Sequence, residues 1–255
     1  MDYKHITLET DGDLALVTMR RPEQRNALSE AHLRELLDAF RRIGDGRARG
    51  AILAAEGPVF SAGHDFSDMA DRDLSEMRKL LGVCAEVMKM IQAVPQPVIA
   101  QVQGLATAAG CQLVAACDLA VASETARFQV PGGIGGWFCT TPGVALVRAV
   151  GRKHALEMLL TGDPIDAPTA MAWGLVNRVV PEGQLEKETR ALLGRATRGS
   201  ALSKGIGKRA FYRQVDMELG AAYNYATEVM AESSQTDDAR ENVRAFLEKR
   251  KPRFK

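Results

Sequence analysis

The chain lacks the features that mark several classes of protein. Its 33 Lys and Arg residues nearly balance 32 Asp and Glu residues, so no excess charge of one sign favours a nucleic acid or an anionic membrane as partner. No apolar run reaches the ~18 residues that a membrane span needs. The first residues, MDYKHITLETDGDL, show no basic stretch followed by an apolar one. We therefore expect a cytoplasmic protein, with removal of a transit peptide as the alternative, and neither a nucleic-acid nor a membrane partner.

Cysteine and histidine are scarce, with four residues of each in the chain. The cysteines stand in apolar stretches without C-x-x-C spacing, and no pair among His5, His32 and His154 has the spacing of metal ligands. We expect reduced cysteines that pack in the core and no metal site. The cysteines are Cys84, Cys111, Cys117 and Cys139.

Strand and helix patterns alternate along most of the chain. Residues 6–19 predict two strands around an Asp-Gly turn, Ser29 begins an amphipathic helix, and 51–56 is a buried strand. A helix over 75–93, a strand over 97–104, a helix from near Ala108 and two short strands follow. From Pro142 the pattern is mainly helical, with a strand over 175–180 and three helical stretches to Leu247. This predicts an α/β core over residues 1–195 and a helical lobe over 196–255.

Two small-residue turns carry the strongest functional signal. PVFSAGHDF (58–66) and VQGLATAAGCQLVAACD (102–118) each open a helix with side chains small enough for a ligand to approach the backbone. The amide of His64 and an amide at the start of the second helix are then available to one substrate oxygen. Such a pair forms an oxyanion hole, in which one donor contributes roughly 3–4 kcal/mol. The pattern alone fits tight packing turns of an ordinary α/β protein equally well.

Longer segments resemble a known family. RPEQRNALS (21–29), FSAGHDF (60–66), VQGLATAAGCQLVAACDLAVAS (102–123), FQVPGGIGG (128–136), residues 141–181 and FLEKRKPRF (246–254) are together similar to the enoyl-CoA hydratase/isomerase (crotonase) superfamily. The subgroup it most resembles is the enoyl-CoA hydratase domain-containing proteins. The resemblance implies a ClpP-like spiral of repeated ββα units, a helical trimerisation lobe, and a homotrimer or a dimer of trimers.

The resemblance also implies a site for a CoA thioester, bound as substrate, with no tightly bound cofactor. The oxyanion donors fall on the backbone amides of His64 and Ala109, which hold the thioester carbonyl and stabilise its enolate. The other implied contacts are Arg25 to Ala27 along CoA, Ala62, Asp65 and Phe66 near its adenine, and Phe246 and Lys249 reaching the CoA of a neighbouring subunit.

The chain departs from the family at its two catalytic glutamates, whose positions align with Gln112 and Gly132. Adding water across a double bond needs a base for the water and an acid for the α-carbon. An amide cannot exchange a proton at neutral pH, and glycine offers no group at all. We therefore expect a poor crotonyl-CoA hydratase.

Other residues near these positions have two interpretations each. The His64 side chain is either a substitute base or points away from the substrate. Asp65 either caps a helix or contacts CoA, with a proton-shuttle role as a further alternative. Trp137 and Cys139 either line the acyl pocket or, as we expect, pack in the interior. Asp118, between a helix and a strand, is interpreted as structural.

Three functions fit this sequence. The favoured one is an acyl-CoA enzyme of the hydratase/isomerase type, a lyase or isomerase of fatty-acid metabolism. The second is a decarboxylase of malonyl-type thioesters, in which loss of CO₂ itself generates the enolate. The third is a non-catalytic acyl-CoA binder, which the two missing glutamates predict directly.

Overall fold

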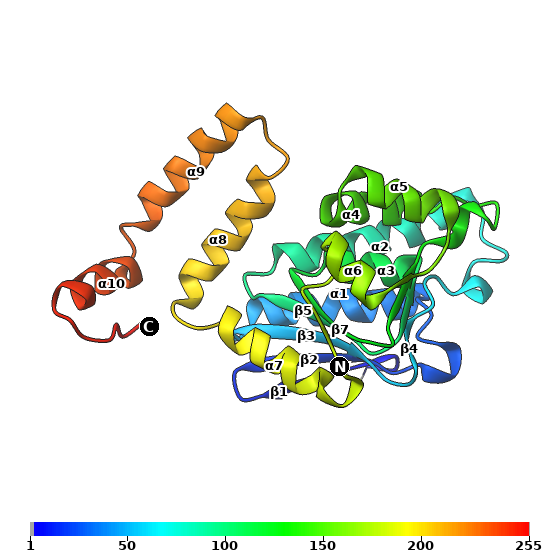
Figure 1. Cartoon of the computed structure of the whole chain (residues 1–255), viewed down its shortest axis with the longest axis horizontal. Helices are drawn as coiled ribbons and strands as arrows, with labels where there is room; N and C mark the ends of the chain where they lie inside the picture. Colours follow the sequence, from blue (N-terminus) through cyan, green and yellow to red (C-terminus); the bar gives the residue numbers. More distant parts are fainter. Residues whose placement is uncertain (1–2, 255) are drawn as a thin grey trace.

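Two β-sheets form the centre of the chain in a computed structural model that describes residues 3–254 (Figure 1). The larger sheet has the order β1-β2-β3-β5-β7-β10; β1 and β2 are antiparallel and the remaining pairs are parallel. Its strands are β1 (Ile6–Asp11), β2 (Leu14–Met19), β3 (Gly50–Ala55), β5 (Val98–Val102), β7 (Leu119–Ser123) and β10 (Arg178–Val180). The smaller sheet has the order β4 (Val59–Ser61), β6 (Leu105–Thr107), β8 (Arg127–Gln129) and β9 (Ile165–Asp166).

A strand-strand-helix unit repeats along the chain, as predicted. In β3-β4-α2, β5-β6-α3 and β7-β8-α4, the first strand joins the larger sheet, the second joins the smaller sheet, and a helix follows. The first strands read as continuous apolar runs because helices cover the sheet. Since β4 and β6 are parallel neighbours, the loops that leave them emerge at the same edge.

The helices of the core begin at strong capping signals. Ser29 accepts a hydrogen bond from the His32 amide and caps α1, and Asp73 with Glu76 forms a capping box at α2. The core helices are α1 (Glu30–Asp45), α2 (Leu74–Ala93), α3 (Ala109–Ala116), α4 (Thr140–Val150), α5 (Arg152–Thr161), α6 (Ala167–Trp173) and α7 (Leu185–Ala196), with short 3-10 turns η1 (Pro22–Gln24), η2 (Phe66–Asp68), η3 (Pro131–Gly133) and η4 (Glu182–Gln184).

Helices α8 (Ala201–Gln214), α9 (Leu219–Ser233) and α10 (Asp237–Leu247) extend away from the sheets as a lobe (Figure 1). After the last strand the structure has four helices, α7 to α10, so the prediction of three helical stretches is wrong. The extra helix, α7, packs on the larger sheet rather than joining the lobe. Among residues 3–254, no helix combines the length and apolarity that crossing a membrane requires.

The predicted strand over 175–180 is also shorter than expected. Only Arg178–Val180 pairs with β7. The amides of Leu175 and Val176 donate to the carbonyl of Ala170 at the end of α6, at 2.8 and 3.4 Å, so they are not available to a strand ladder. Both side chains are buried, and this is why the sequence pattern resembles a strand.

Asp118 joins the lobe to the core, which confirms its structural role. Its carboxylate accepts from the Val98 amide at 2.7 Å and from the Tyr212 hydroxyl at 2.8 Å, and it lies 2.6 Å from Lys208 Nζ. Lys208 also donates to the carbonyls of Ile91 and Gln96. The side chains of Asp118, Lys208 and Tyr212 all have partners in this contact, so α8 is held against the end of α2.

Candidate functional site

The amide of His64 points away from the strand beside it. Leu28 donates to the Gly63 carbonyl at 2.7 Å and accepts from the Asp65 amide at 3.2 Å, forming a parallel bridge with His64. In this pattern the middle residue directs its own N–H to the opposite side. His64 is also one of the residues that line the cavity described below.

The loops after β4 and β6 touch at Gly63 and Ala109. Gly63 has φ of +83°, and a Cβ there would lie 3.2 Å from the Ala109 nitrogen and 2.9 Å from the Ala108 Cβ. Only glycine accepts both this dihedral angle and this contact. Ala109 is the first residue of α3, so its amide has no acceptor within the helix. The two turns predicted from the sequence therefore meet at one place.

Ala108 links β6 to α3 through a strained backbone. Its φ of 49° and ψ of −117° are rare for a residue with a side chain. The conformation is held by hydrogen bonds on both sides, because its amide donates to Gln129 and its carbonyl accepts from the Gln112 amide. Such strain concentrates at functional sites, where neighbouring structure over-determines it.

A cavity of about 540 Å³, which we call the acyl cavity, opens beside these amides. Its wall comprises four segments of chain, which are the loop after β4 (62–66), Leu81 of α2, the junction of β6 and α3 (107–109), and the segment that leads into α4 (131–142). Of the residues predicted from sequence, the wall contains Ala62, His64, Phe66, Ala109, Gly132 and Trp137. It does not contain Arg25, Ala27, Asp65, Gln112, Phe246 or Lys249.

The titratable side chains on this wall are neutral at pH 7. Burial lowers the pKa of His64, an effect that the Leu28 carbonyl and the Asp68 carboxylate partly offset. Burial likewise raises the pKa of the Cys139 thiol. Both ring nitrogens of His64 and the Thr107 hydroxyl are buried without a hydrogen-bond partner in the described chain. His64 and Thr107 line the cavity, but these unpaired side-chain atoms are themselves buried.

The positions of the two missing glutamates differ in their surroundings. Gln112 is buried behind the wall, and its Oε1 has no partner among the described residues. Gly132 lies on the wall, but a Cβ there would lie 2.2 Å from the Trp137 carbonyl oxygen and 2.7 Å from Cys139 Sγ. Segment 137–139 fills the space that a side chain at 132 would need. A simple Gly132→Glu replacement would not restore a carboxylate at this site.

The structure distinguishes the two roles considered for Trp137 and Cys139, which are to line the acyl pocket or to pack in the interior. Trp137 is 47% exposed at the mouth of the cavity, so the expectation that it packs in the interior is wrong. The Trp137 amide donates to the Gly132 carbonyl at 2.8 Å, so the residue belongs to a turn at the cavity mouth rather than to the packed interior. Cys139 is buried on the wall, and all four cysteines are reduced and buried, as predicted.

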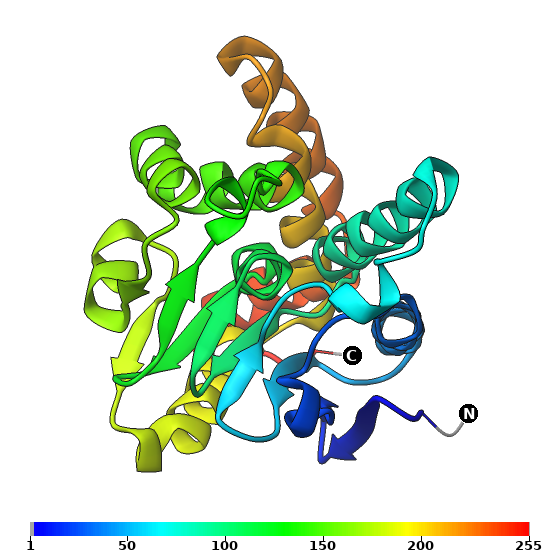
Figure 2. The ribbon, with the colours of Figure 1, turned by 90° about the vertical axis from the view of Figure 1, so that its right-hand side faces the viewer.

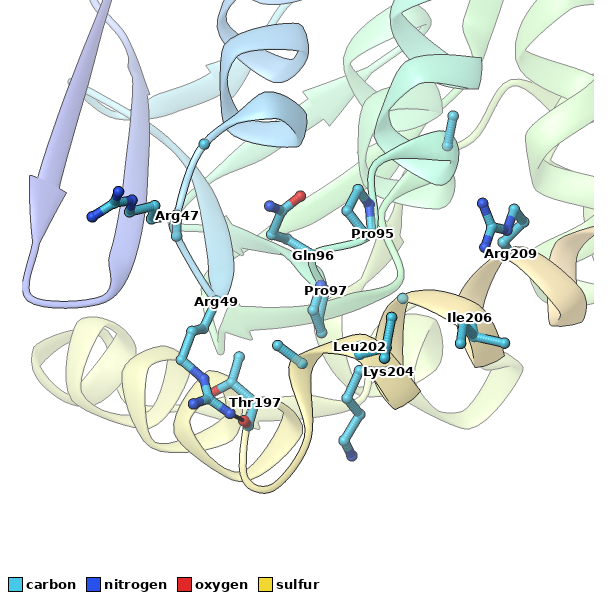
Figure 3. Close-up of a pocket in the computed structure, with 15 residues that line it drawn as sticks. Arg47, Arg49, Pro95, Gln96, Pro97, Thr197, Leu202, Lys204, Ile206 and Arg209 are labelled. Atoms are coloured by element: carbon cyan, nitrogen blue, oxygen red, sulfur yellow. Dashed lines mark hydrogen bonds between the residues drawn. The ribbon is translucent and has the colours of Figure 1, made fainter. Parts of the chain in front are cut away.

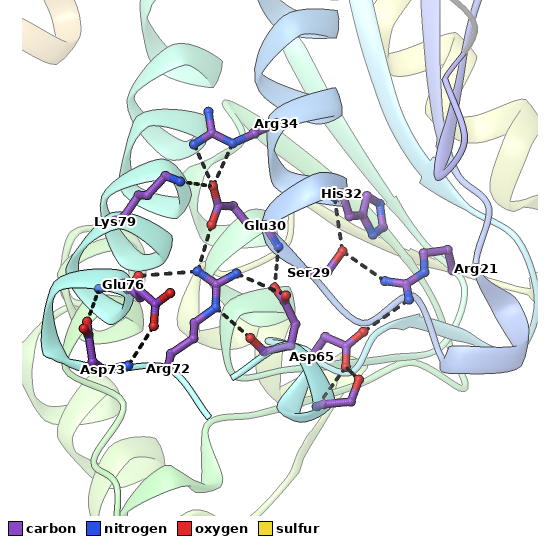
Figure 4. A network of polar contacts seen from close by, with 12 residues as sticks. Arg21, Ser29, Glu30, His32, Arg34, Asp65, Arg72, Asp73, Glu76 and Lys79 are labelled. Carbon is purple, nitrogen blue, oxygen red and sulfur yellow. Dashed lines mark hydrogen bonds and ion pairs between the residues drawn. The ribbon is translucent and has the colours of Figure 1, made fainter. Parts of the chain in front are cut away.

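Arg25 to Ala27 run beside the predicted CoA residues without entering the cavity. The Ala62 amide donates to the Arg25 carbonyl at 2.9 Å. Asp65 caps η2 by accepting from the Ser67 amide, and it pairs with Arg21 at 3.2 Å (Figure 4). The capping interpretation of Asp65 is confirmed. Its carboxylate bonds to these partners and does not line the cavity, which argues against the proton-shuttle interpretation.

A charged network that the sequence did not reveal fixes the loop bearing Phe66 (Figure 4). Glu30 accepts from Arg72 at 2.8 Å and from Arg34, and these contacts lower its pKa to about 2. The Glu30 amide donates to Asp68 at 2.7 Å, which ties η2 to α1. The Glu30–Arg34 and Asp68–Arg72 pairs have a four-residue spacing that is visible in sequence, whereas Arg72 lies 42 positions from Glu30.

Phe246 and Lys249 lie at the end of the lobe. Phe246 is exposed, and neither residue contributes to the acyl cavity of its own chain. Figure 1 shows α10 on the far side of the lobe from the core. The predicted contact with CoA therefore requires a second copy of the chain.

A second cavity, of about 390 Å³, lies between the core and α8 (Figure 3). We call it the basic groove. Pro95, Pro97, Leu202 and Ile206 contribute its apolar surface, while its charged lining residues are Arg47, Arg49, Lys204 and Arg209. Arg49 donates to the Thr197 carbonyl and lies 3.8 Å from Asp13. None of the sequence-predicted site residues lies here.

Comparison with known proteins identifies the family. The model of the enoyl-CoA hydratase/isomerase family matches residues 9–255. The chain belongs to this family. It is similar to a crystal structure of enoyl-CoA hydratase from Mycobacterium smegmatis, with a TM-score of 0.95, 45% identity and 98% of each chain covered. The expected crotonase fold is thereby confirmed.

Two vertebrate relatives carry one name, "Enoyl-CoA hydratase domain-containing protein 3, mitochondrial". The Xenopus laevis protein is 44% identical over 96% of this chain and 84% of its own length. The human protein is 44% identical over 92% of this chain and 78% of its own length. These mitochondrial relatives contradict the expected cytoplasmic location, which is wrong. Charge balance and the lack of a long apolar run describe a folded domain and carry no information about its compartment.

Proposed function

We propose that this chain binds a CoA thioester in the acyl cavity and polarises its carbonyl with the amides of His64 and Ala109. The proposal places the chain among acyl-CoA enzymes of the hydratase/isomerase type in fatty-acid metabolism. One observation carries it: both amides border the same cavity, and the loops that hold them touch at Gly63.

The physical basis is electrostatic. Fixed N–H donors stabilise a negative oxygen more strongly in a cavity that excludes water, because they need no reorganisation as charge develops. Ala109 also stands at the N-terminus of α3, whose partial positive charge favours an enolate oxygen. This chemistry needs no cofactor besides the CoA ester itself.

Efficient hydration of crotonyl-CoA does not fit the site. Gln112 carries an amide and lies off the wall, and Gly132 has no space for a side chain. His64 and Thr107 are the lining residues whose buried polar side-chain atoms lack partners in the described chain. We propose that any proton transfer is carried by these two side chains and is slow.

A non-catalytic acyl-CoA binder is the second candidate. The packing of segment 137–139 against Gly132 favours it, because the loop occupies the place of an acid-base group. In both functions CoA follows Arg25 to Ala27 towards Ala62 and Phe66, and Phe246 and Lys249 of a neighbouring copy contact it in a trimer or a dimer of trimers.

The test removes one donor without changing a side chain. Replacing Ala109 with lactic acid converts its amide to an ester and deletes the N–H. With carbon-13 at the thioester carbonyl of crotonyl-CoA, infrared spectroscopy of the bound ligand should show a shift to lower frequency in the unmodified protein. The ester variant should lose much of that shift and bind the thioester at least tenfold more weakly, since each donor contributes roughly 3–4 kcal/mol to a developing oxyanion and less to a ground-state carbonyl.

The matched control is the same ester at Ala201, the first residue of α8, which lies outside the acyl cavity. Equal infrared shifts in the Ala109 and Ala201 variants would refute the oxyanion proposal. Hydration of crotonyl-CoA by the unmodified protein should stay below about 10 per second, the median turnover of enzymes. A faster rate would show that another group supplies the missing acid and base.

A further inference from the structure

We propose that Cys139 adds its thiol to the β-carbon of 2-enoyl-CoA thioesters bound in the acyl cavity, beside the position of a missing family glutamate. This inference rests on the proposed function, in which the amides of His64 and Ala109 hold the thioester carbonyl. It gives the site a covalent reaction that requires neither of the two absent carboxylates.

The first observation is the place of the Cys139 sulfur. Gly132 stands at the position that aligns with one of the two catalytic glutamates of the family, and a Cβ there would lie 2.7 Å from Cys139 Sγ. The sulfur therefore occupies space that the first atoms of a glutamate side chain would take. Cys139 lines the acyl cavity together with His64 and Ala109. A thioester held by the two amides lies in the same cavity as this thiol.

The second observation is that the other three cysteines are placed elsewhere. Cys84, Cys111 and Cys117 are buried and do not line the acyl cavity. Burial raises the pKa of the Cys84 and Cys111 thiols to about 12, so these groups are unreactive at pH 7. All four cysteines of the chain lie within residues 3–254, and Cys139 is the one that lines this cavity.

The third observation is the local environment of the Cys139 thiol. Burial raises its pKa, and the backbone amide of Gly132 offsets part of this rise. Cys139 is also the N-cap residue of α4, and the partial positive charge of a helix N-terminus favours a thiolate. The group is therefore a neutral thiol at pH 7 whose thiolate is stabilised by backbone dipoles. Such a thiol should react more slowly than the thioester binds.

The addition is balanced without a further reactant. The Cys139 thiol loses its proton as the bond from Sγ to the β-carbon forms, and the electron pair of the double bond moves to the thioester oxygen. The amides of His64 and Ala109 stabilise the resulting enolate. One proton then arrives at the α-carbon, which restores the carbonyl and leaves a thioether. The proposed function assigns proton transfer at this site to His64 and Thr107, and these side chains carry this proton as well.

The experiment follows the intact full-length protein by mass spectrometry after incubation with crotonyl-CoA and an acid quench. We expect a mass increase equal to one whole crotonyl-CoA, which peptide fragmentation should assign to Cys139. The second-order rate constant should exceed that of N-acetylcysteine by roughly a hundredfold or more, because binding orients the reacting atoms. Butyryl-CoA has no double bond, so it should form no adduct and should slow the reaction by competition.

Two variants separate the thiol from its surroundings. Cys139→Ser replaces the thiol with a hydroxyl of similar size that is a much weaker nucleophile, so the adduct should disappear while butyryl-CoA still binds. Cys84→Ala is the matched control, because this buried cysteine of α2 lies outside the cavity, and it should keep the full rate. Circular dichroism and calorimetric titration with butyryl-CoA check that both variants fold and bind.

The outcomes separate this inference from the proposed function. A mass increase equal to the acyl group alone would mean that a nucleophile attacks the carbonyl and expels CoA, which overturns the inference. An adduct on another residue, or one that persists in Cys139→Ser, overturns it as well. Binding of butyryl-CoA without any adduct from crotonyl-CoA overturns the inference while the thioester site stands. Absence of binding by every thioester overturns both.

Discussion

The acyl cavity and the basic groove are two cavities of one chain that differ in the charge of their lining residues. The acyl cavity is lined by neutral side chains and bordered by two free amides, whereas the basic groove has four cationic side chains in its lining. The acyl cavity is built where loops from one sheet edge are in close contact. The groove is built where the lobe meets the core, largely by exposed side chains. Under the proposed function, fixed backbone dipoles rather than net charge define the thioester site.

Acidification should produce the largest loss of stability, through a histidine on the acyl-cavity side of the molecule. His32 is fully buried behind segment 25–28, its Nδ1 lies 3.1 Å from the Ala27 carbonyl oxygen, and burial lowers its pKa to about 4. In the unfolded chain the pKa of His32 is about 6.5. Between pH values of about 4 and about 6.5, the unfolded chain therefore binds a proton at His32 more readily than the folded chain does. The free energy of unfolding should therefore fall by about 3 kcal/mol as pH drops from about 6.5 to about 4.

Denaturant unfolding across this pH range measures the effect of His32. In a His32→Gln variant, the free energy of unfolding should depend much less on pH over this range. The His154→Gln variant, changed on α5, should keep the original pH dependence. An unchanged slope in His32→Gln would show that other groups govern the acid response.

Adding one methyl group at Gly132 should damage the wall of the acyl cavity. The new Cβ of Gly132→Ala would overlap the Trp137 carbonyl and Cys139 Sγ. Overpacking of this kind costs about 1–3 kcal/mol, and displacement of segment 137–139 should weaken acyl-CoA binding. Gly135→Ala is the matched control, because its nearest heavy atom is at 3.7 Å. Equal stability and affinity in the two variants would show that the contact at Gly132 is unimportant.

The smallest effects are expected in the basic groove. Arg47→Gln, Lys204→Gln and Arg209→Gln change exposed side chains that form no ion pair within residues 3–254. Each should alter the free energy of unfolding by no more than about 0.5 kcal/mol and leave the acyl-CoA dissociation constant within twofold of its original value. A tenfold loss of acyl-CoA affinity in any of these variants would indicate that the CoA ester binds in the basic groove rather than in the acyl cavity.

Much of the local structure was predictable because it follows from short-range patterns. Ser29 caps α1 as expected, the turns at 58–66 and 102–118 open at one cavity, and the alternation of strands and helices gives the repeated unit. These features depend on residues within a few positions of one another. The family resemblance extended that reasoning to the arrangement of the units in space.

The less predictable features depend on contacts between distant segments. The sequence could show that Gly132 lacks a carboxylate, but not that segment 137–139 fills the space beside it. It could not show that Gln112 stays behind the wall, that Trp137 is exposed, or that Arg72 reaches Glu30. Each outcome is set by which surfaces meet once the sheets form.

The sequence by itself determined the family, the order of the structural elements and the absence of two carboxylates, because these are properties of the residues and their spacing. Tertiary structure decided which polar atoms remain without partners and which charges are neutralised. Those outcomes arise only when segments far apart in the chain exclude water from one another. The neutrality of the acyl cavity is such an outcome, since it requires Arg21 and Arg72 to be paired outside it.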